Sequence, residues 1–300
     1  MSAFGRLLTA MVTPFDDRGE VDYVQAKRLA LTLVASGSDG LVVSGTTGES
    51  PTLTWAEKLR LFAEIKAAVG DKGTIIAGTG NYSTRESIEL TREAEKAGVD
   101  GALLVVPYYN KPTQEGLYQH FRAIAESTIL PCVLYNVPSR TITNMLPETV
   151  IRLAAVPNIV GIKEASANLE QVARIIHETA EDFLVWSGND GDTFHIMSMG
   201  GYGVISVASH LVGFEIKQMI ERCLAGEMAA AGAVHIALLP LVSALFIVSN
   251  PMPVKYALNQ VGFSVGKPRL PLTEPDERSA ETIRKTLGRY KIDLRIQHQV

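Results

Sequence analysis

The feature that most constrains the fold is an alternation of short apolar runs with helical stretches, repeated eight times between residues 7 and 224. The apolar runs are continuous, which is typical of parallel strands that helices cover on both faces. These runs lie at residues 7–14, 40–45, 74–78, 102–106, 132–135, 159–163, 183–186 and 203–207. The helical stretches lie at residues 23–35, 55–69, 84–97, 114–127, 147–155, 169–179, 193–199 and 214–224.

Eight such units predict a closed (β/α)8 barrel. The competing architecture is an open doubly wound sheet, which usually has a Gly-rich first turn, whereas the first turn here reads PFDDRG. Further helical stretches follow at residues 229–248, 254–261 and 275–290. No linker composition divides the chain. We therefore expect an α/β TIM barrel over residues 1–225, with residues 226–300 as a C-terminal helical extension packed on it.

Composition excludes several classes of function. The 300 residues carry a formal net charge of −4, which leaves no basic footprint for nucleic acid. The sequence shows no polybasic membrane patch and no signal peptide, and we expect that no apolar run approaches the length that spans a bilayer. Cys132 and Cys223 are the only cysteines, which suggests a reducing compartment. We expect a cytoplasmic protein without nucleic-acid or membrane partners.

One lysine stands inside the sixth apolar run, residues 159–166 (IVGIKEAS). Burying an unpaired ammonium is costly, so a buried lysine tends to lose its proton. A neutral amine is a nucleophile and can form a Schiff base with a carbonyl substrate. The alternative is that Lys163 ends the strand and either reaches water or pairs with Glu164, since structural ion pairs also perturb lysines.

Polar residues follow several of the predicted strands, at the barrel end where function is concentrated. These segments are 45–50 (GTTGES), 107–110 (PYYN), 135–140 (YNVPSR), 187–190 (SGND) and 203–206 (GVIS). Hydroxyls, phenols, an arginine and a lysine thus converge on one rim. This convergence favours a catalytic Lys163.

Each of these side chains also has a structural interpretation. Thr46 and Thr47 could belong to a simple turn, or they could donate hydrogen bonds to a carboxylate. Tyr135 could be a core tyrosine, although its place beside Lys163 favours a proton shuttle. Arg140 could form a surface ion pair, or it could bind a carboxylate in a bidentate manner.

Other catalytic chemistries find little support in the sequence. The six histidines show no metal-ligand spacing, so we expect no metal site. There is no Gly-x-Ser-x-Gly nucleophile elbow and no Walker loop.

Together, the motifs resemble the 4-hydroxy-tetrahydrodipicolinate synthase (dihydrodipicolinate synthase) family, within the superfamily of pyruvate-type class I aldolases and N-acetylneuraminate lyases. The segments that carry the resemblance are 45–50, 107–110, 116–121 (GLYQHF), 135–140, 161–165 (GIKEA), 203–207 (GVISV) and 250–255 (NPMPVK). The match runs almost end to end. The paired Thr46 and Thr47, with Arg140, narrow it to the synthase.

The resemblance implies a Schiff-base enzyme of lysine and diaminopimelate biosynthesis that condenses pyruvate with L-aspartate 4-semialdehyde. Lys163 would form an imine with pyruvate, and the derived enamine would attack the aldehyde. The resemblance implies no metal or organic cofactor, because the lysine supplies the electron sink. It also implies a homotetramer, built as a dimer of tight dimers.

The resemblance assigns further residues to catalysis and to binding. Tyr135 would shuttle protons in a relay with Thr46 and Tyr109, and Tyr109 would reach in from the neighbouring subunit. Substrate binding would fall to residues that hold the two carboxylates or line the pocket: Thr47 and the Ile205 backbone for pyruvate, Arg140 for the semialdehyde, and Gly188 in the pocket wall.

Two alternatives stay open. A sibling aldolase, such as N-acetylneuraminate lyase or a keto-deoxy sugar acid aldolase, would share Lys163 and Tyr135. Neuraminate lyases, however, typically carry Ser-Thr in place of Thr46-Thr47 and lack a counterpart of Arg140. The other alternative is a barrel that only binds a keto acid.

Family members that lysine inhibits bind it at the tight-dimer interface. By the resemblance, this chain keeps Glu86 and Tyr108 at matching positions but departs at Trp55, Lys58 and Tyr82. We therefore expect weak or absent inhibition by lysine.

Overall fold

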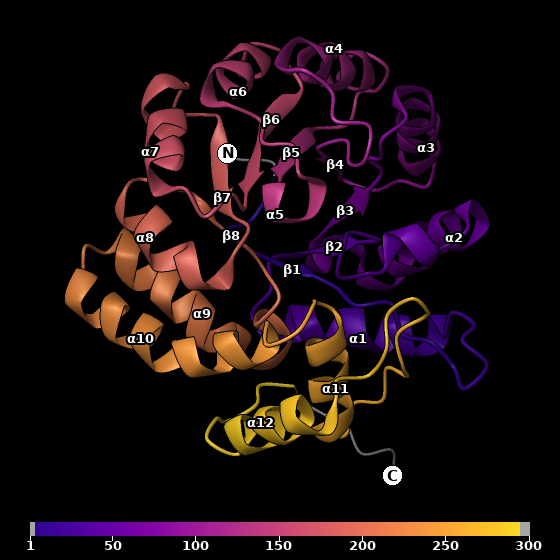
Figure 1. The fold of residues 1–300 in the computed structure, drawn as a ribbon, viewed down its shortest axis with the longest axis vertical. Helices are drawn as coiled ribbons and strands as arrows, with labels where there is room; N and C mark the ends of the chain where they lie inside the picture. The colour runs from indigo at the N-terminus through magenta and orange to yellow at the C-terminus, as the bar shows by residue number, and fades with distance from the viewer. Residues whose placement is uncertain (1–3, 295–300) are drawn as a thin grey trace.

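The structure is a computed structural model that describes residues 4–294, and its centre is a closed barrel of eight parallel strands (Figure 1). The strands pair in chain order, and β8 closes the ring by pairing with β1. They are β1 (Leu7–Ala10), β2 (Gly40–Val43), β3 (Thr74–Gly78), β4 (Gly101–Val105), β5 (Cys132–Asn136), β6 (Ile159–Glu164), β7 (Leu184–Ser187) and β8 (Gly203–Ser206). The predicted TIM barrel is confirmed.

Helices surround the barrel on its outer side (Figure 1). They are α1 (Tyr23–Ala35), α2 (Trp55–Val69), α3 (Thr84–Lys96), α4 (Gln114–Ala125), α6 (Pro147–Ala154), α7 (Leu169–Glu178), α8 (Thr193–Ser198) and α9 (Ser209–Leu224), whereas the short α5 (Pro138–Thr141) lies over the end of the barrel. The predicted helix ends differ by at most two residues for most of these. The exceptions are α9, which begins at Ser209 and contains a kink at Val212, and the short α5, which the sequence pattern did not predict.

The barrel interior is packed solid toward its N-terminal end. Trp186 of β7 is fully buried there and lies against Phe4, which precedes β1, at a ring-centroid distance of 6.3 Å. The indole N–H of Trp186 donates to the Gly5 carbonyl oxygen at 3.1 Å, so its one polar group is satisfied. These side chains fill the N-terminal end of the barrel interior.

Three helices follow the barrel: α10 (Met228–Leu245), α11 (Met252–Gln260) and α12 (Glu277–Leu287). They lie on one side of the molecule, beneath α1 and α9 in the view of Figure 1. Helix α10 packs on α9 and α12, and α11 packs on α9, α10 and α12. The division of the chain at residue 225 stays a prediction.

Helix α10 corrects one expectation from the sequence. Its 18 residues have a mean hydropathy of 1.9, so by length and composition it is apolar enough to cross a membrane. Ala231, Leu238 and Leu241 of this helix face the neighbouring helices, whereas Ile236 is 67% exposed. The expectation that no run approaches a spanning length was wrong for this helix.

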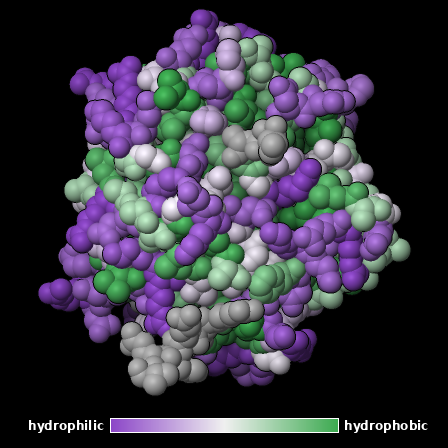
Figure 2. All heavy atoms as spheres, turned by 180° about the vertical axis from the view of Figure 1, so that it is seen from behind, coloured by the Kyte–Doolittle hydropathy of each residue, from purple (hydrophilic) through white to green (hydrophobic). Residues whose placement is uncertain are grey.

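Figure 2 shows the opposite face of the molecule from Figure 1, on which hydrophilic and hydrophobic side chains are mixed.

Candidate active site

Lys163 lies in β6 and is buried, with 5% of its surface exposed. Its register partner on β5 is Tyr135, so both side chains share the inner face of the barrel. The Lys163 Nζ lies 4.3 Å from the centroid of the Tyr135 ring. Within residues 4–294 the Lys163 amine makes no hydrogen bond and no ion pair. The contact that the structure shows for this amine is with the aromatic face of Tyr135.

The alternative pairing of Lys163 with Glu164 does not occur. Successive residues of a strand point to opposite faces, so the Glu164 carboxylate lies on the outer side. There it accepts hydrogen bonds from the Ser166 N–H at 2.7 Å, from Gln171 Nε2 at 3.1 Å and from Asn136 Nδ2 at 3.2 Å. Burial raises the pKa of Glu164, although these hydrogen bonds act in the opposite direction. Glu164 therefore holds the segment after β6 in place and leaves Lys163 unpaired.

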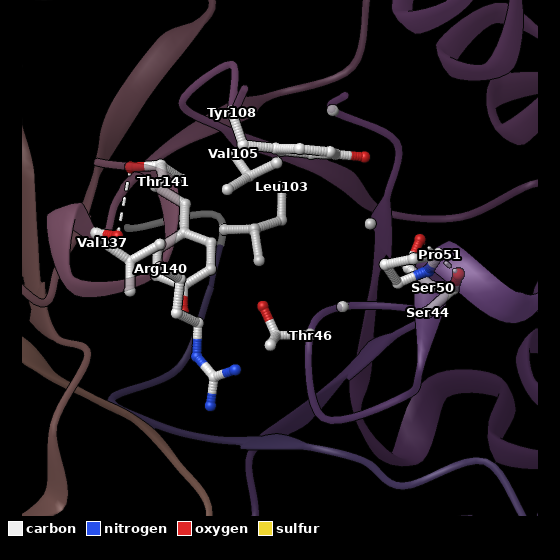
Figure 3. Close-up of a pocket in the computed structure, with 14 residues that line it drawn as sticks. Ser44, Thr46, Ser50, Pro51, Leu103, Val105, Tyr108, Val137, Arg140 and Thr141 are labelled. Carbon is white, nitrogen blue, oxygen red and sulfur yellow. Dashed lines mark hydrogen bonds between the residues drawn. The ribbon is translucent and has the colours of Figure 1, made fainter. Parts of the chain in front are cut away.

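A cavity of about 240 Å³ opens at the C-terminal end of the barrel (Figure 3). Pockets for drug-sized ligands have about 300–1,000 Å³, so this one suits a small molecule. Its walls are formed by Ser44, Gly45, Thr46, Ser50, Pro51, Gly78, Gly80, Leu103, Val105, Tyr108, Tyr135, Val137, Arg140 and Thr141. Three of the residues predicted for the site are among them: Thr46, Tyr135 and Arg140. Lys163, Thr47, Gly188 and Ile205 do not line it, but Lys163 lies against the Tyr135 ring that does.

The loop after β2 presents its two threonines differently. Thr46 is half-buried and points into the cavity, toward the same space as Arg140 (Figure 3). Thr47 is buried, and its Oγ1 accepts a hydrogen bond from Asn250 Nδ2 at 2.9 Å. Thr13 Oγ1 donates to the Gly48 carbonyl oxygen at 2.7 Å, which fixes the next turn of the loop. Hydrogen bonds from other segments therefore hold the loop that carries the two threonines.

Glu49 links the same loop to the C-terminal extension. Its backbone is left-handed, with φ at 57°, which is unusual for a residue with a side chain. Its carboxylate accepts from Lys255 Nζ at 2.8 Å and from the Arg269 N–H at 2.8 Å. Both donors belong to the C-terminal extension. The sequence reasoning assigned no role to either, because nothing in their local pattern indicates the distant partner.

Arg140 extends from the short helix α5 over the mouth of the cavity (Figure 3). Its Nη2 donates to the Asn250 backbone carbonyl at 3.1 Å. Within the described part of the chain it has no carboxylate partner, so the alternative of a surface ion pair does not apply there. Asn250, which sequence reasoning recorded only as part of the 250–255 motif, contacts both Thr47 and Arg140.

Ile205 and Gly188 lie beside the cavity rather than in its wall. Ile205 is buried in β8 with 1% exposure. The Gly188 N–H donates to the Glu164 carbonyl oxygen at 2.7 Å, and a Cβ at Gly188 would lie 2.7 Å from that of Ala165. The tight packing of two neighbouring strand ends therefore requires glycine there.

Asp190 organises the turn after β8, a role that sequence reasoning missed. Its carboxylate accepts from Ser206 Oγ, from the Val207 N–H at 3.0 Å and from the Ala208 N–H at 3.1 Å. Burial raises the pKa of Asp190, whereas these hydrogen bonds and the nearby Lys163 ammonium lower it. The Asp190 carboxylate is thus turned toward hydrogen-bond donors of the segment after β8.

Tyr109 does not reach the cavity of its own chain. It is 95% exposed, and its φ of 73° places it in the left-handed region, which strains a bulky residue. Its neighbour Tyr108 lines the cavity and packs edge-on against Tyr82 with ring centroids 5.2 Å apart. Among the described residues, no hydrogen bond joins the hydroxyls of Tyr135, Thr46 and Tyr109.

The site offers no evident metal ligands. Among residues 4–294 there is no group of three or more His, Cys, Asp or Glu side chains that could hold a metal ion. The chemistry that the described side chains offer is that of an amine, a phenol, hydroxyls and a guanidinium.

Comparisons with known proteins agree with this arrangement. Residues 3–289 match the model of the dihydrodipicolinate synthetase family. A 4-hydroxy-tetrahydrodipicolinate synthase from Dehalococcoides mccartyi strain CBDB1 is 63% identical over 99% of this chain and 100% of its own. The structure of a dihydrodipicolinate synthase from Cyanidioschyzon merolae with lysine bound is 50% identical, with a TM-score of 0.94 over 96% of this chain and 98% of its own.

The structure of a third similar protein carries a statement about its assembly. It is described as the first monomeric dihydrodipicolinate synthase variant, and it is 44% identical with a TM-score of 0.93 over 95% of this chain and 96% of its own. The family match covers nearly the whole chain, including every predicted site residue. The chain belongs to the dihydrodipicolinate synthetase family.

Proposed function

We propose that this protein is a 4-hydroxy-tetrahydrodipicolinate synthase, which condenses pyruvate with L-aspartate 4-semialdehyde. The observation that carries the proposal is the buried Lys163 amine, which has no acceptor within residues 4–294 and lies 4.3 Å from the ring of a cavity-lining tyrosine. Family membership and the 63% identical synthase support it.

The first half of the reaction uses Lys163 and Tyr135. The neutral amine of Lys163 adds to C2 of pyruvate, and loss of water gives an imine. The positive imine nitrogen withdraws electrons, so a methyl proton can leave to give an enamine. Tyr135 carries protons to and from the reacting groups, because its ring already contacts the amine.

In the second half, the enamine carbon attacks the aldehyde carbon of the semialdehyde, and the aldehyde oxygen takes up a proton. The substrate amino group then attacks the imine carbon, closes the ring and releases the Lys163 amine. No external oxidant or reductant is needed. We assign the pyruvate carboxylate to Thr47 and the Ile205 backbone, and the semialdehyde carboxylate to Arg140 at the mouth.

We propose a homotetramer of tight dimers in which Tyr109 completes the relay of the neighbouring subunit. The exposed ring of Tyr109 on a left-handed backbone supports this, because a neighbouring subunit would cover a ring that is exposed in the isolated chain. The exposed apolar side chains of α10, such as Ile236, are a second surface that assembly could cover. Sedimentation tests the proposal: a fully active monomer would exclude a Tyr109 supplied by another subunit.

We place the protein in the cytoplasm. Cys132 and Cys223 are both buried and unpaired, as in proteins of reducing compartments.

Borohydride trapping tests the proposed function. Incubation with pyruvate followed by borohydride should reduce the imine to a stable adduct, which mass spectrometry of peptides should place on Lys163. A coupled assay should then show turnover with aspartate semialdehyde but not with N-acetylmannosamine. Turnover with N-acetylmannosamine instead would identify a sibling aldolase. Absence of an adduct would favour a barrel that only binds its ligand.

A further inference from the structure

We propose that Asn250 is a positioning residue that turns the hydroxyl proton of Thr47 toward the carboxylate of pyruvate. The inference rests on the proposed function and deepens it. It concerns a residue outside the barrel strands, in the segment between α10 and α11.

Asn250 contacts both of the proposed carboxylate-binding side chains. It is buried, with 5% exposure. Its Nδ2 donates to Thr47 Oγ1 at 2.9 Å, and its backbone carbonyl accepts from Arg140 Nη2 at 3.1 Å. One residue of the C-terminal extension therefore sets the spacing between the hydroxyl of Thr47 and the guanidinium of Arg140.

The direction of the hydrogen bond decides what Thr47 can do. A threonine hydroxyl has one proton to donate and lone pairs that accept. Because Thr47 Oγ1 accepts from the Asn250 amide, its own proton is not used in that bond. Within residues 4–294 Thr47 Oγ1 makes no other hydrogen bond. The proton is therefore available to an incoming anion, which is the polarity that a carboxylate requires.

The other end of the amide has no partner. Asn250 Oδ1 is buried and makes no hydrogen bond within residues 4–294. With Nδ2 toward Thr47, the described residues leave the oxygen and one N–H of the amide unpaired, and the reverse orientation would leave both N–H groups unpaired. The unpaired oxygen also shows that the position is not optimised for stability. Such departures are expected where a side chain serves binding.

Kinetics of single and double variants test the proposal. We expect Asn250→Ala and Thr47→Val each to raise the KM for pyruvate by roughly tenfold or more, as befits a lost hydrogen bond to a charged group, with a smaller change in kcat. If Asn250 acts through Thr47, the double variant should have the pyruvate KM of Thr47→Val alone. Multiplying effects, or an unchanged pyruvate KM in Asn250→Ala, would overturn the proposal.

A nearly isosteric variant covers the case in which Asn250→Ala does not fold. Asn250→Asp replaces the donor by an acceptor, which would take the Thr47 proton and add a negative charge beside the proposed carboxylate sites. We expect it to raise the pyruvate KM more than Asn250→Ala does, and also to raise that for the semialdehyde. A pyruvate KM in Asn250→Asp equal to that of the wild type would contradict the proposal.

A matched control separates positioning from general destabilisation. Asn259 of α11 is another asparagine of the extension, with hydrogen bonds to the Gly266 carbonyl and from the Val265 N–H. Asn259→Ala should lower the melting temperature without changing either KM. A KM change as large as that of Asn250→Ala would make the effect structural. If the wild type itself forms no borohydride-trapped adduct, the proposed function fails; if it does form one and the variants behave otherwise, only this inference fails.

Discussion

Two lysines of this protein are removed from water, and they differ in what surrounds the ammonium. Lys255 of α11 is fully buried and donates to Glu49 Oε1 at 2.8 Å, to the Thr13 carbonyl at 3.0 Å and to the Lys267 carbonyl at 3.1 Å. All three of its donors are used. Lys163 of β6 is 5% exposed, and the described residues offer its amine no acceptor.

Each of the two lysines also lies against an aromatic ring. Lys255 Nζ lies 4.1 Å from the Phe15 centroid, and Lys163 Nζ lies 4.3 Å from that of Tyr135. Burial lowers the pKa of Lys255 to about 8, although Glu49 acts in the opposite direction. Neither burial nor an aromatic contact therefore distinguishes a reactive lysine. The difference lies in the acceptors: Lys255 donates three hydrogen bonds, whereas the Lys163 amine has no acceptor among the described residues, which fits the proposed role of Lys163.

The largest expected effect separates these two lysines directly. Lys163→Ala should abolish the borohydride-trapped pyruvate adduct and nearly all turnover, because it removes the amine that we propose as the nucleophile. Lys255→Ala should retain the adduct in whatever fraction folds, because its amine takes no part in the chemistry. Peptide mass spectrometry of both variants checks this. A pyruvate adduct on Lys255 in the Lys163→Ala variant would reverse the assignment.

The second-largest effect concerns the phenol of Tyr135, whose ring lies against the Lys163 amine. Tyr135→Phe keeps the aromatic face but removes the phenol, so turnover should fall by roughly 10²–10⁴, the usual range for a positioned acid–base group. Imine formation should slow as well, since the shuttle serves several steps. Tyr202→Phe is the control, because its phenol donates to the Phe4 carbonyl at the closed end of the barrel. Wild-type turnover in Tyr135→Phe would show that the phenol only packs.

The ion pair of Lys255 should matter for stability rather than for chemistry. Glu49→Gln or Lys255→Met alone leaves one charge buried and should lower the free energy of unfolding by about 3–5 kcal/mol. The double variant should lose less than the sum, because no unpaired charge remains. Denaturant unfolding measures all three. Additive losses would mean that Glu49 and Lys255 do not act as a pair.

A smaller effect is expected at the mouth of the cavity. Arg140→Ala should raise the KM for the semialdehyde by about tenfold or more while changing that for pyruvate less, since a lost contact weakens mainly the ligand that made it. Steady-state kinetics with each substrate varied in turn provides the measurement. Equal changes in both constants would give Arg140 a structural role.

The smallest effect involves a third lysine, Lys58 of α2. Burial lowers the pKa of Lys58, while the Glu86 carboxylate raises it. Glu86 also accepts from Asn81 Nδ2 at 2.8 Å. A cation beside Glu86 competes with the ammonium of any lysine ligand there, so we expect weak or absent inhibition by lysine. Half-inhibition of the coupled assay at sub-millimolar lysine would contradict this, and Lys58→Ala should strengthen inhibition.

Much of the barrel was predictable because its information is local. Continuous apolar runs and helical stretches follow each other along the chain, and each strand pairs with the next, so neighbours in sequence are neighbours in space. The rim residues Thr46, Tyr135 and Arg140 were predictable for the same reason, because parallel strands end at one face. The short helix α5 was missed, since four residues are too few for a periodic pattern.

What the sequence alone determined is the eightfold repeat, the lysine within an apolar strand and the polar segments at the strand ends. Only the tertiary structure decided which buried lysine is paired, and which residue contacts both Thr47 and Arg140. Asn250 is 203 residues from Thr47, and Lys255 is 206 residues from Glu49. No local pattern encodes such contacts, because they form only when the C-terminal helices pack beside the closed barrel.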